Sequence, residues 1–255
     1  MPEIILNDLT LGYDRHPAVH HLNAVIKSGS MTAIIGPNGA GKSTLMKGIV
    51  GALPPLDGKI TMVCKKCISK NNRDNIAYLP QQADIDRSFP VPIFDLVAMG
   101  LWREVGAFGM INAAQTSRIN NALATVGLTG FERRPISALS GGQMQRVLFA
   151  RLLLQEADLI LLDEPFTSID AKTAADLMLL VQRWHAEGRT VLAVLHDLDT
   201  VRDQIPDTMM IAREMVAHGP TERVLTPANL MRARQICEAF DNNASVCMPE
   251  VRGIQ

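Results

Sequence analysis

MTAIIGPNGAGKST (31–44) joins a short apolar run to a glycine-rich loop and then to a stretch with helical character. The loop fits the pattern G-x-x-x-x-G-K-[ST] through Gly36, Gly41, Lys42 and Ser43. Glycines let backbone N–H groups turn inward around phosphate oxygens, and the N-terminus of the following helix favours the same anion. Lys42 can bridge terminal phosphates, and Ser43 offers a hydroxyl to Mg²⁺. The stretch therefore predicts a nucleotide-phosphate site between a buried strand and a helix.

The whole loop is expected to lie against the nucleotide: Gly36, Pro37, Asn38, Gly39, Ala40, Gly41, Lys42, Ser43 and Thr44.

LILLDEP (159–165) supplies the complement of this loop. Its four apolar residues predict a buried strand that ends at Asp163 and Glu164. An acid at the end of a strand beside such a loop can hold Mg²⁺, which suits Asp163. Glu164 comes one residue later and points differently, so it can reach the attacking water. Together the two motifs predict a nucleotide-hydrolysing site, of a kind that kinases and GTPases also share.

Composition limits the other possibilities. The chain has 255 residues, and 25 Lys and Arg nearly balance 26 Asp and Glu, for a net charge of -1. Nucleic-acid binders usually carry a basic excess, so we expect no nucleic-acid partner. No apolar run approaches the roughly 18 to 20 residues that span a bilayer, and MPEIILNDLT (1–10) lacks the basic start of a signal peptide. We expect a cytoplasmic protein that reaches a membrane only through a partner.

Two kinds of pattern divide the chain. Apolar runs alternate with helical stretches in most of it, which favours a parallel sheet with crossover helices. Between about Gln81 and Leu154 only helical spacing occurs, which predicts an inserted helical lobe. Strands are expected at 3–8, 18–27, 31–35, 59–64, 75–80, 158–163, 190–196, 208–212 and 214–219, and helices at 42–51, 94–102, 116–128, 141–155 and 171–187.

LSGGQ (139–143) lies between the two phosphate motifs, and with it the chain resembles the ATP-binding cassette (ABC) ATPases. Gln81, which ends YLPQ, resembles the family's Q-loop glutamine, which contacts Mg²⁺ and the transmembrane partner. Asp170 stands in the place of the D-loop acid. His196 matches the switch histidine that contacts the terminal phosphate, and Tyr13 stands where the family stacks an aromatic ring on adenine. The motifs occur in the family's order, although Ile169 replaces the usual leucine of the D-loop.

The resemblance implies an α/β fold: a P-loop (RecA-like) core with a parallel sheet, an antiparallel β subdomain and an inserted helical subdomain. It covers roughly residues 3 to 225. A single ABC ATPase domain is expected at 1–240, with its α/β core at 1–80 and 156–225, its helical subdomain at about 81–155, and a flexible tail at 241–255.

In this family two cassettes bind head to tail, and the signature loop of one faces the P-loop of the other. The resemblance implies that Ser140, Gly141 and Gly142 contact the terminal phosphate that the partner holds, and Gln143 is counted with them in the nucleotide-binding set. Glycines permit close backbone approach and the helix dipole favours the anion, so this loop needs no lysine. The implied cofactors are ATP and Mg²⁺. The implied catalytic residues are Glu164, His196 and Gln81, the Mg²⁺ ligands are Ser43, Gln81 and Asp163, and Asp170 joins the nucleotide-binding set.

Three classes of ABC ATPase compete. An importer subunit is favoured over ribosome-acting ATPases, which carry two cassettes, and over DNA-repair types, because only about 95 residues separate the P-loop from the signature. A separate-chain exporter remains open. The stretch 80–109 resembles the zinc and manganese uptake subgroup, as do 163–166 and 218–230, although Pro92 departs from its usual Thr or Ser. Zinc is the expected cargo, ahead of manganese and iron, and siderophore, haem and cobalamin importers have related sequences.

The expected partners are a second copy of the chain, an integral membrane permease and, indirectly, a periplasmic or extracellular metal-binding protein. The permease is expected to dock near the Q-loop, at about 81–109, on the inner face of the membrane. Five apolar residues are candidates for that surface, at least half of which are expected to belong to the lobe's core: Phe89, Phe94, Leu101, Trp102 and Phe108.

Other polar residues invite a metal-sensing interpretation, against which the sequence argues. Neighbouring strand residues point to opposite faces, so His20 and His21 cannot easily share a metal, and a solvated loop with incidental histidines is favoured. Cys64 and Cys67 form a lone CxxC, which is a weak zinc signal. Gln82 could replace Gln81 as the Q-loop glutamine, but the YLPQ match favours Gln81.

Overall fold

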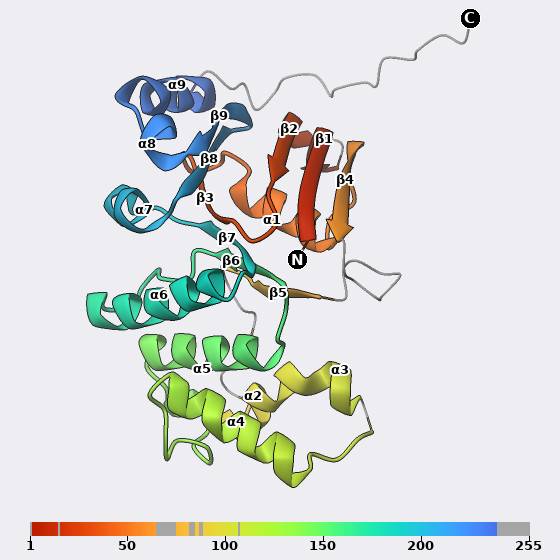
Figure 1. Ribbon diagram of the computed structural model, residues 1–255, viewed down its shortest axis with the longest axis vertical. Coiled ribbons are helices and arrows are strands. Elements are labelled where there is room, and N and C mark those ends of the chain that lie inside the picture. The colour runs from red at the N-terminus through yellow and green to blue at the C-terminus, as the bar shows by residue number, and fades with distance from the viewer. Residues whose placement is uncertain are drawn as a thin grey trace, which may run out of the picture.

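The computed structural model describes residues 2–14, 16–64, 75–81, 85–86, 89–106 and 108–238. Gln82, Cys67 and the expected tail at 241–255 lie outside these residues, and so does the side chain of Cys64. The described part forms two sheets with helices packed between and below them (Figure 1).

The larger sheet has six strands in the order β5-β6-β7-β3-β8-β9. All neighbouring pairs are parallel except β8 and β9. Every residue of β3, β6 and β7 is buried, as expected for short apolar strands covered on both faces. The strands are β3 (Met31–Ile35), β5 (Ile76–Leu79), β6 (Leu159–Asp163), β7 (Thr190–Val194), β8 (Asp207–Ala212) and β9 (Glu214–Pro220).

The smaller sheet is antiparallel and has the order β2-β1-β4. Its strands are β1 (Pro2–Tyr13), β2 (His16–Ile26) and β4 (Asp57–Cys64). Between the two sheets lies α1 (Lys42–Val50), as Figure 1 shows.

A group of helices connects β5 to β6, which are neighbours in the sheet. Figure 1 shows this group below the large sheet, with α5 between α6 and the other members of the group. Its members are α2 (Ile93–Ala98), η1 (Met99–Leu101), α3 (Trp102–Val105), α4 (Ala113–Thr125), η2 (Ile136–Ala138) and α5 (Gly141–Leu154). The remaining helices are α6 (Ala171–Ala186), α7 (Leu198–Gln204), α8 (Thr221–Val224) and α9 (Pro227–Glu238).

The large sheet separates two hydrophobic cores. On β3, Ala33 and Ile35 pack into the core that contains α4, α5 and α6, whereas Ile34 packs into the core that contains α1 and β1. On β6, Leu161 faces the α1 core and Leu162 the other, since alternate strand residues point to opposite faces. This alternation brings the end of β6 beside the start of α1.

The predicted fold class is confirmed, and the differences are local. The strand expected at 3–8 continues to Tyr13. A bulge with Asp8 at φ 49° shifts its register and breaks the alternation of buried and exposed residues, so the sequence pattern ends before the strand does. The expected solvated loop with incidental histidines is wrong, since His20 and His21 lie on β2. The short helices α7 and α8 and the C-terminal α9 were not predicted. Of the residues of α9 only Ala233 is fully buried, while Leu230, Ile236 and Cys237 pack against the core and are partly buried.

Candidate functional site

The glycine loop between β3 and α1 has a shape that only glycine permits at two positions. Gly41 caps α1 with φ 88°, and a Cβ there would overlap Val19. A Cβ on Gly36 would overlap the carbonyl oxygen of Ile211. The sequence therefore fixes a tight loop at the N-terminus of α1, with backbone amides available to an anion.

The side chain of Lys42 folds back over this loop. Its Nζ donates to the carbonyl oxygens of Gly36 at 2.8 Å and Pro37 at 2.9 Å, and the residue is buried. Desolvation lowers the pKa of Lys42, while the charges of Glu164 and Asp163 oppose that shift. In this state the ammonium group is held by backbone oxygens that a phosphate can replace.

Ser43 and Asp163 meet from opposite motifs. Ser43 Oγ donates to Asp163 Oδ1 at 3.1 Å, and Asp163 is buried. Burial raises the pKa of Asp163, and the Ser43 hydrogen bond opposes this. A hydroxyl and a carboxylate are oxygen ligands of the kind that Mg²⁺ prefers, so these residues fit that ion.

Gln81, Glu164 and His196 converge from the ends of three neighbouring strands. Glu164 Oε2 accepts a hydrogen bond from Gln81 Nε2 at 2.8 Å, and Glu164 Oε1 lies 2.6 Å from His196 Nε2. Thr167 Oγ1 donates to Oε2 at 3.3 Å. Glu164 has a left-handed backbone, with φ 51°, a conformation that is costly for a non-glycine residue and clusters at functional sites.

Gln81, Glu164 and His196 line one cavity of about 660 Å³ together with residues of the glycine loop. The carboxyl ends of parallel strands meet at one edge of a sheet, which is where α/β proteins bind ligands. The lining residues are Ala18, Asn38, Gly39, Ala40, Gly41, Lys42, Ser43, Thr44, Gln81, Glu164 and His196.

Tyr13 lies beside α1, outside this lining set. Its ring is 47% exposed, and Lys47 Nζ lies 3.4 Å from its hydroxyl and 5.8 Å from its ring centroid. The ring is thus accessible to a planar ligand next to the loop.

The signature residues lie at the start of α5, on the other side of the large sheet from α1 (Figure 1). Ser140 and Gln143 form a capping box: Gln143 N donates to Ser140 Oγ at 3.2 Å, and Ser140 N donates to Gln143 Oε1 at 3.1 Å. Neither they nor Gly141 and Gly142 appear among the described residues that line the cavity. One chain alone therefore does not bring the signature to the P-loop.

Asp170 lies next to the signature and caps α6. It accepts hydrogen bonds from Thr173 N at 2.9 Å and Thr173 Oγ1 at 2.8 Å, and these bonds lower the pKa of Asp170. A Cβ on Gly142 would lie 3.5 Å from Asp170 Oδ2.

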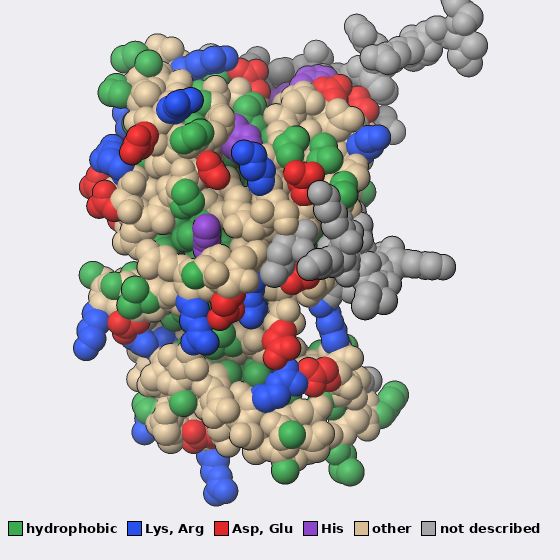
Figure 2. Space-filling model, viewed as in Figure 1, with side chains coloured by type: hydrophobic (Ala, Val, Ile, Leu, Met, Phe, Trp, Pro, Cys, Tyr) green, Lys and Arg blue, Asp and Glu red, His purple; other side chains and the backbone are tan. Residues whose placement is uncertain are grey.

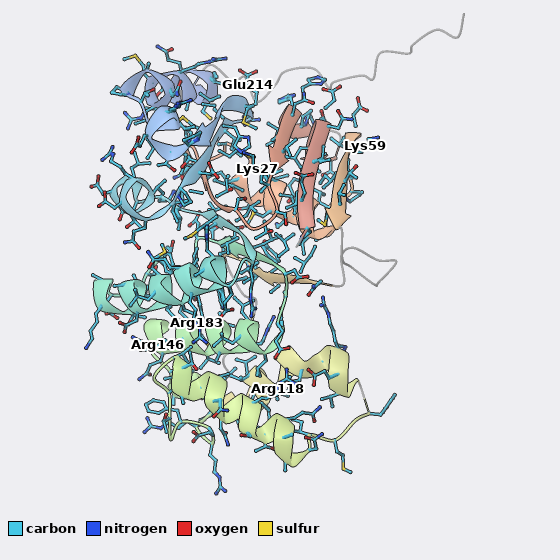
Figure 3. All side chains as sticks on the ribbon, viewed as in Figure 1. Lys27, Lys59, Arg118, Arg146, Arg183 and Glu214 are labelled. Atoms are coloured by element: carbon cyan, nitrogen blue, oxygen red, sulfur yellow. The ribbon has the colours of Figure 1, made fainter. Side chains whose placement is uncertain are left out.

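Gln145 and Arg146, which come just after LSGGQ (139–143), make contacts that the sequence did not predict. Gln145 Nε2 donates to the carbonyl oxygen of Pro165 at 2.7 Å, next to Glu164. Arg146 donates to Val126 O at 3.0 Å and to Asp176 Oδ2 at 2.8 Å. Figure 3 shows Arg146 between the helices of this region. Their place directly after the signature was the available signal.

The candidate docking residues divide. Phe89, Trp102 and Phe108 are 65%, 61% and 101% exposed, whereas Leu101 is buried and Phe94 packs against the core. Figure 2 shows hydrophobic side chains on the surface of this lower lobe.

Two further features bear on metals and membranes. In the part of the chain that the structure describes, no three side chains of His, Cys, Asp or Glu gather as a metal site. No helix there is both long and apolar enough to cross a bilayer.

Comparisons with known proteins agree with this site. Residues 19–167 match the family model described as ABC transporter. The chain is 38% identical over 228 residues to the manganese transport system ATP-binding protein MntB of Listeria monocytogenes, covering 89% of this chain and 94% of that protein. It is 39% identical over 228 residues to the zinc transport system ATP-binding protein TroB of Treponema pallidum, covering 89% and 85%.

Among solved structures, the fold is similar to the ATP-binding cassette MJ0796, a dimer in a post-hydrolysis state bound to ADP and Pi. The TM-score is 0.74 at 25% identity, covering 86% of this chain and 98% of that one. The family model spans more than half of the chain and the relatives cover most of it, so the resemblance seen in the sequence is confirmed. The chain belongs to the ABC transporter family, as an ATPase.

Proposed function

We propose that this chain is the ATP-hydrolysing subunit of a membrane importer for a divalent metal ion. The observation that carries the enzymatic part is the meeting of Gln81, Glu164 and His196 at the wall of the phosphate cavity. A release assay for phosphate, with ATP and Mg²⁺, tests it directly.

Each residue has a distinct part in this proposal. Lys42 leaves the backbone oxygens and bridges the terminal phosphates, while the amides of the loop surround them. Glu164, whose two carboxylate oxygens are both held by neighbours, orients the attacking water and accepts a proton from it. His196 contacts the terminal phosphate. Mg²⁺ neutralises charge on the phosphates when bound. Ser43, Asp163 and Gln81 would hold that ion, and Tyr13 would stack on the adenine.

The signature residues would act on the site of a second copy. A Cβ on Gly141 or Gly142 meets nothing closer than 3.5 Å, and neither glycine has a positive φ. Glycine is thus not required there by the fold of this chain, although it weakens a helix start. Glycine at these positions is explained if a phosphate held by the partner chain must approach the backbone closely. Asp170, beside Gly142, would lie at the same interface.

A mixed dimer tests this head-to-tail arrangement. Each composite site combines Lys42 of one subunit with Ser140 of the other. A homodimer of Lys42→Ala subunits, or of Ser140→Arg subunits, therefore has two defective sites. A heterodimer of the two would keep one intact site and one doubly defective site, so trapped nucleotide should amount to one per dimer. No trapped nucleotide, as expected if each site used the P-loop and the signature of the same chain, would contradict the arrangement.

The cargo is proposed from relatives rather than from this chain's own chemistry. The proteins named for manganese and for zinc are similar to it to almost the same degree. Zinc is our first proposal, manganese the second, and iron or a metal chelate the third. A deletion strain should fail to grow when its cargo metal is limiting and should recover with that metal alone. Normal growth under limitation of each metal would contradict the transport function.

The partner would be an integral membrane permease, with a metal-binding protein outside the membrane acting indirectly. The exposed aromatic side chains Phe89, Trp102 and Phe108, near the Q-loop, are the proposed docking surface on its cytoplasmic face. Replacing Trp102 by Ser should release the chain from membranes that contain the permease. Retention at the wild-type level would place the interface elsewhere.

A further inference from the structure

Tyr78 has a buried hydroxyl group that forms no hydrogen bond with the residues that the structure describes. It lies on β5, in register with Leu161 of the neighbouring β6. Its side chain packs against the core on the α1 side of the sheet. Buried polar groups in native proteins are usually paired, so an orphan hydroxyl calls for a physical reason.

The Tyr78 ring shares its face of the sheet with Asp163. Leu161 packs on the α1 side, and Asp163 follows it by two residues, so both side chains point to that side. Burial, the charge of Asp163, a smaller effect of Tyr13 and an interaction between the hydroxyl and the Asp163 carboxylate raise the pKa of Tyr78 above its usual range. The hydroxyl thus lies near the carboxylate but does not reach hydrogen-bond geometry there. Because a phenol has an ordinary pKa of about 10, it is a hydrogen-bond donor at physiological pH.

Asp163 has capacity for a second donor. Ser43 Oγ donates to Oδ1, which leaves Oδ2 to other partners. A carboxylate accepts about four hydrogen bonds in all. Within the described part of the chain, the buried Tyr78 hydroxyl thus lies near a buried carboxylate whose hydrogen-bonded hydroxyl is that of Ser43.

We propose that Tyr78 is a positioning residue for Asp163: when nucleotide and Mg²⁺ bind, its hydroxyl donates a hydrogen bond to the Asp163 carboxylate and fixes its orientation. Ser43 and Tyr78 then hold the carboxylate from α1 and from β5. The unpaired hydroxyl destabilises the empty site relative to the loaded one, so the bond formed on loading contributes to Mg²⁺ affinity. This inference rests on the ATP and Mg²⁺ site proposed above.

Tyr78→Phe tests the proposal through binding rather than turnover. A fluorescent ATP analogue is titrated onto the protein with EDTA, and then with increasing Mg²⁺ at fixed analogue. The dissociation constant in EDTA should match the wild type, while the Mg²⁺ concentration at half effect should rise about tenfold, as one hydrogen bond to a charged group would give. A wild-type Mg²⁺ midpoint would overturn the proposal.

The chain offers a matched control in Trp184, whose buried indole N–H also has no hydrogen-bond partner among the described residues. Trp184 lies on α6, in the core on the other side of the large sheet from α1. In Trp184→Phe the Mg²⁺ midpoint should stay at the wild-type value. An equal rise in both variants would show a general effect of losing a buried donor, and would overturn the specific role of Tyr78.

The thermal stability of the nucleotide-free protein gives a second, independent readout. Because the Tyr78 hydroxyl has no partner, Tyr78→Phe should leave the Tm unchanged or raise it. A Tm several degrees lower would mean that the hydroxyl is already bonded in the empty protein, which contradicts the proposal. A wild-type protein that binds no nucleotide in EDTA would instead refute the proposed ATP site itself.

Discussion

Nε2 of His196 lies 2.6 Å from Oε1 of Glu164. The two residues follow neighbouring parallel strands, and the carboxylate is largely buried, at 10% side-chain exposure. The contact holds Glu164 beside the P-loop, where it can act on water.

Glu164→Gln should bind ATP normally and lose about 10²–10⁴-fold in turnover, because the amide keeps the shape but cannot accept the proton. An ATP-bound dimer should accumulate, visible by sedimentation, while phosphate release falls. Glu222→Gln, at an exposed position on α8, is the control and should behave as wild type. Phosphate release at the wild-type rate would remove Glu164 from the role of base.

Gly142→Ala should separate stability from function. Alanine favours the helix, so the free energy of unfolding should rise by up to about 1 kcal/mol, since the added Cβ meets only ordinary contacts. ATP-dependent dimerisation should nevertheless fall at least tenfold. Asn120→Ala, at an exposed position of α4, is the control that gains helix propensity without losing dimerisation. A Gly142→Ala protein that dimerises as wild type would contradict close approach of a partner's phosphate.

Arg146→Lys should destabilise the protein by about 1–2 kcal/mol, measured by urea unfolding. The guanidinium group joins Val126 O on one side to Thr173 and Asp176 on α6, and a lysine cannot make this fork. Arg183→Lys is the matched control, because Arg183 makes an exposed pair with Glu187 on its own helix. Figure 3 labels both arginines. Equal effects of the two substitutions would mean that the Arg146 contacts contribute nothing specific.

The half-buried His20 should make the protein less stable in acid. Desolvation, followed by the charges of His21 and Arg213, lowers the pKa of His20, while Glu214 opposes the shift. The unfolded chain then binds more protons than the folded one between the lowered value and about 6.5, so stability rises with pH in that window and is lost as pH falls through it. His20→Gln should flatten this slope in urea unfolding, whereas His16→Gln, at an exposed position on the same strand, should leave it unchanged. An unaltered slope in His20→Gln would assign the acid sensitivity to other groups.

How far the sequence predicts this molecule depends on the kind of signal. The run MTAII matches β3 residue for residue, because a central parallel strand is apolar throughout. The meeting of Gln81, Glu164 and His196 is also foreseeable, since each follows a strand of one parallel sheet. By contrast, the apolar stripe of α9 is weak, with Leu230, Ala233 and Ile236 among polar residues, and the bulge at Asp8 has no periodicity to reveal it.

Contacts that involve backbone groups or unpaired side-chain groups could not be predicted from the sequence, for a different reason. The Gln145 amide that donates to Pro165 O and the unpaired hydroxyl of Tyr78 depend on how two elements pack, not on either stretch alone. For the signature glycines the sequence is more informative than the structure. Their motif is clear in the sequence, but the described fold of one chain gives them no ligand.

The hydrogen bond between Gln81 and Glu164 joins residues 83 positions apart in the chain. It joins the carboxyl ends of two parallel neighbouring strands, β5 and β6. The chain leaves the sheet for the helical lobe beside this bond, after Leu79, and returns at the opposite edge of the sheet, at Leu159. A displacement of the lobe that moves Gln81 would therefore lengthen or break its bond to the carboxylate, so the position of the lobe and the orientation of Glu164 are mechanically linked.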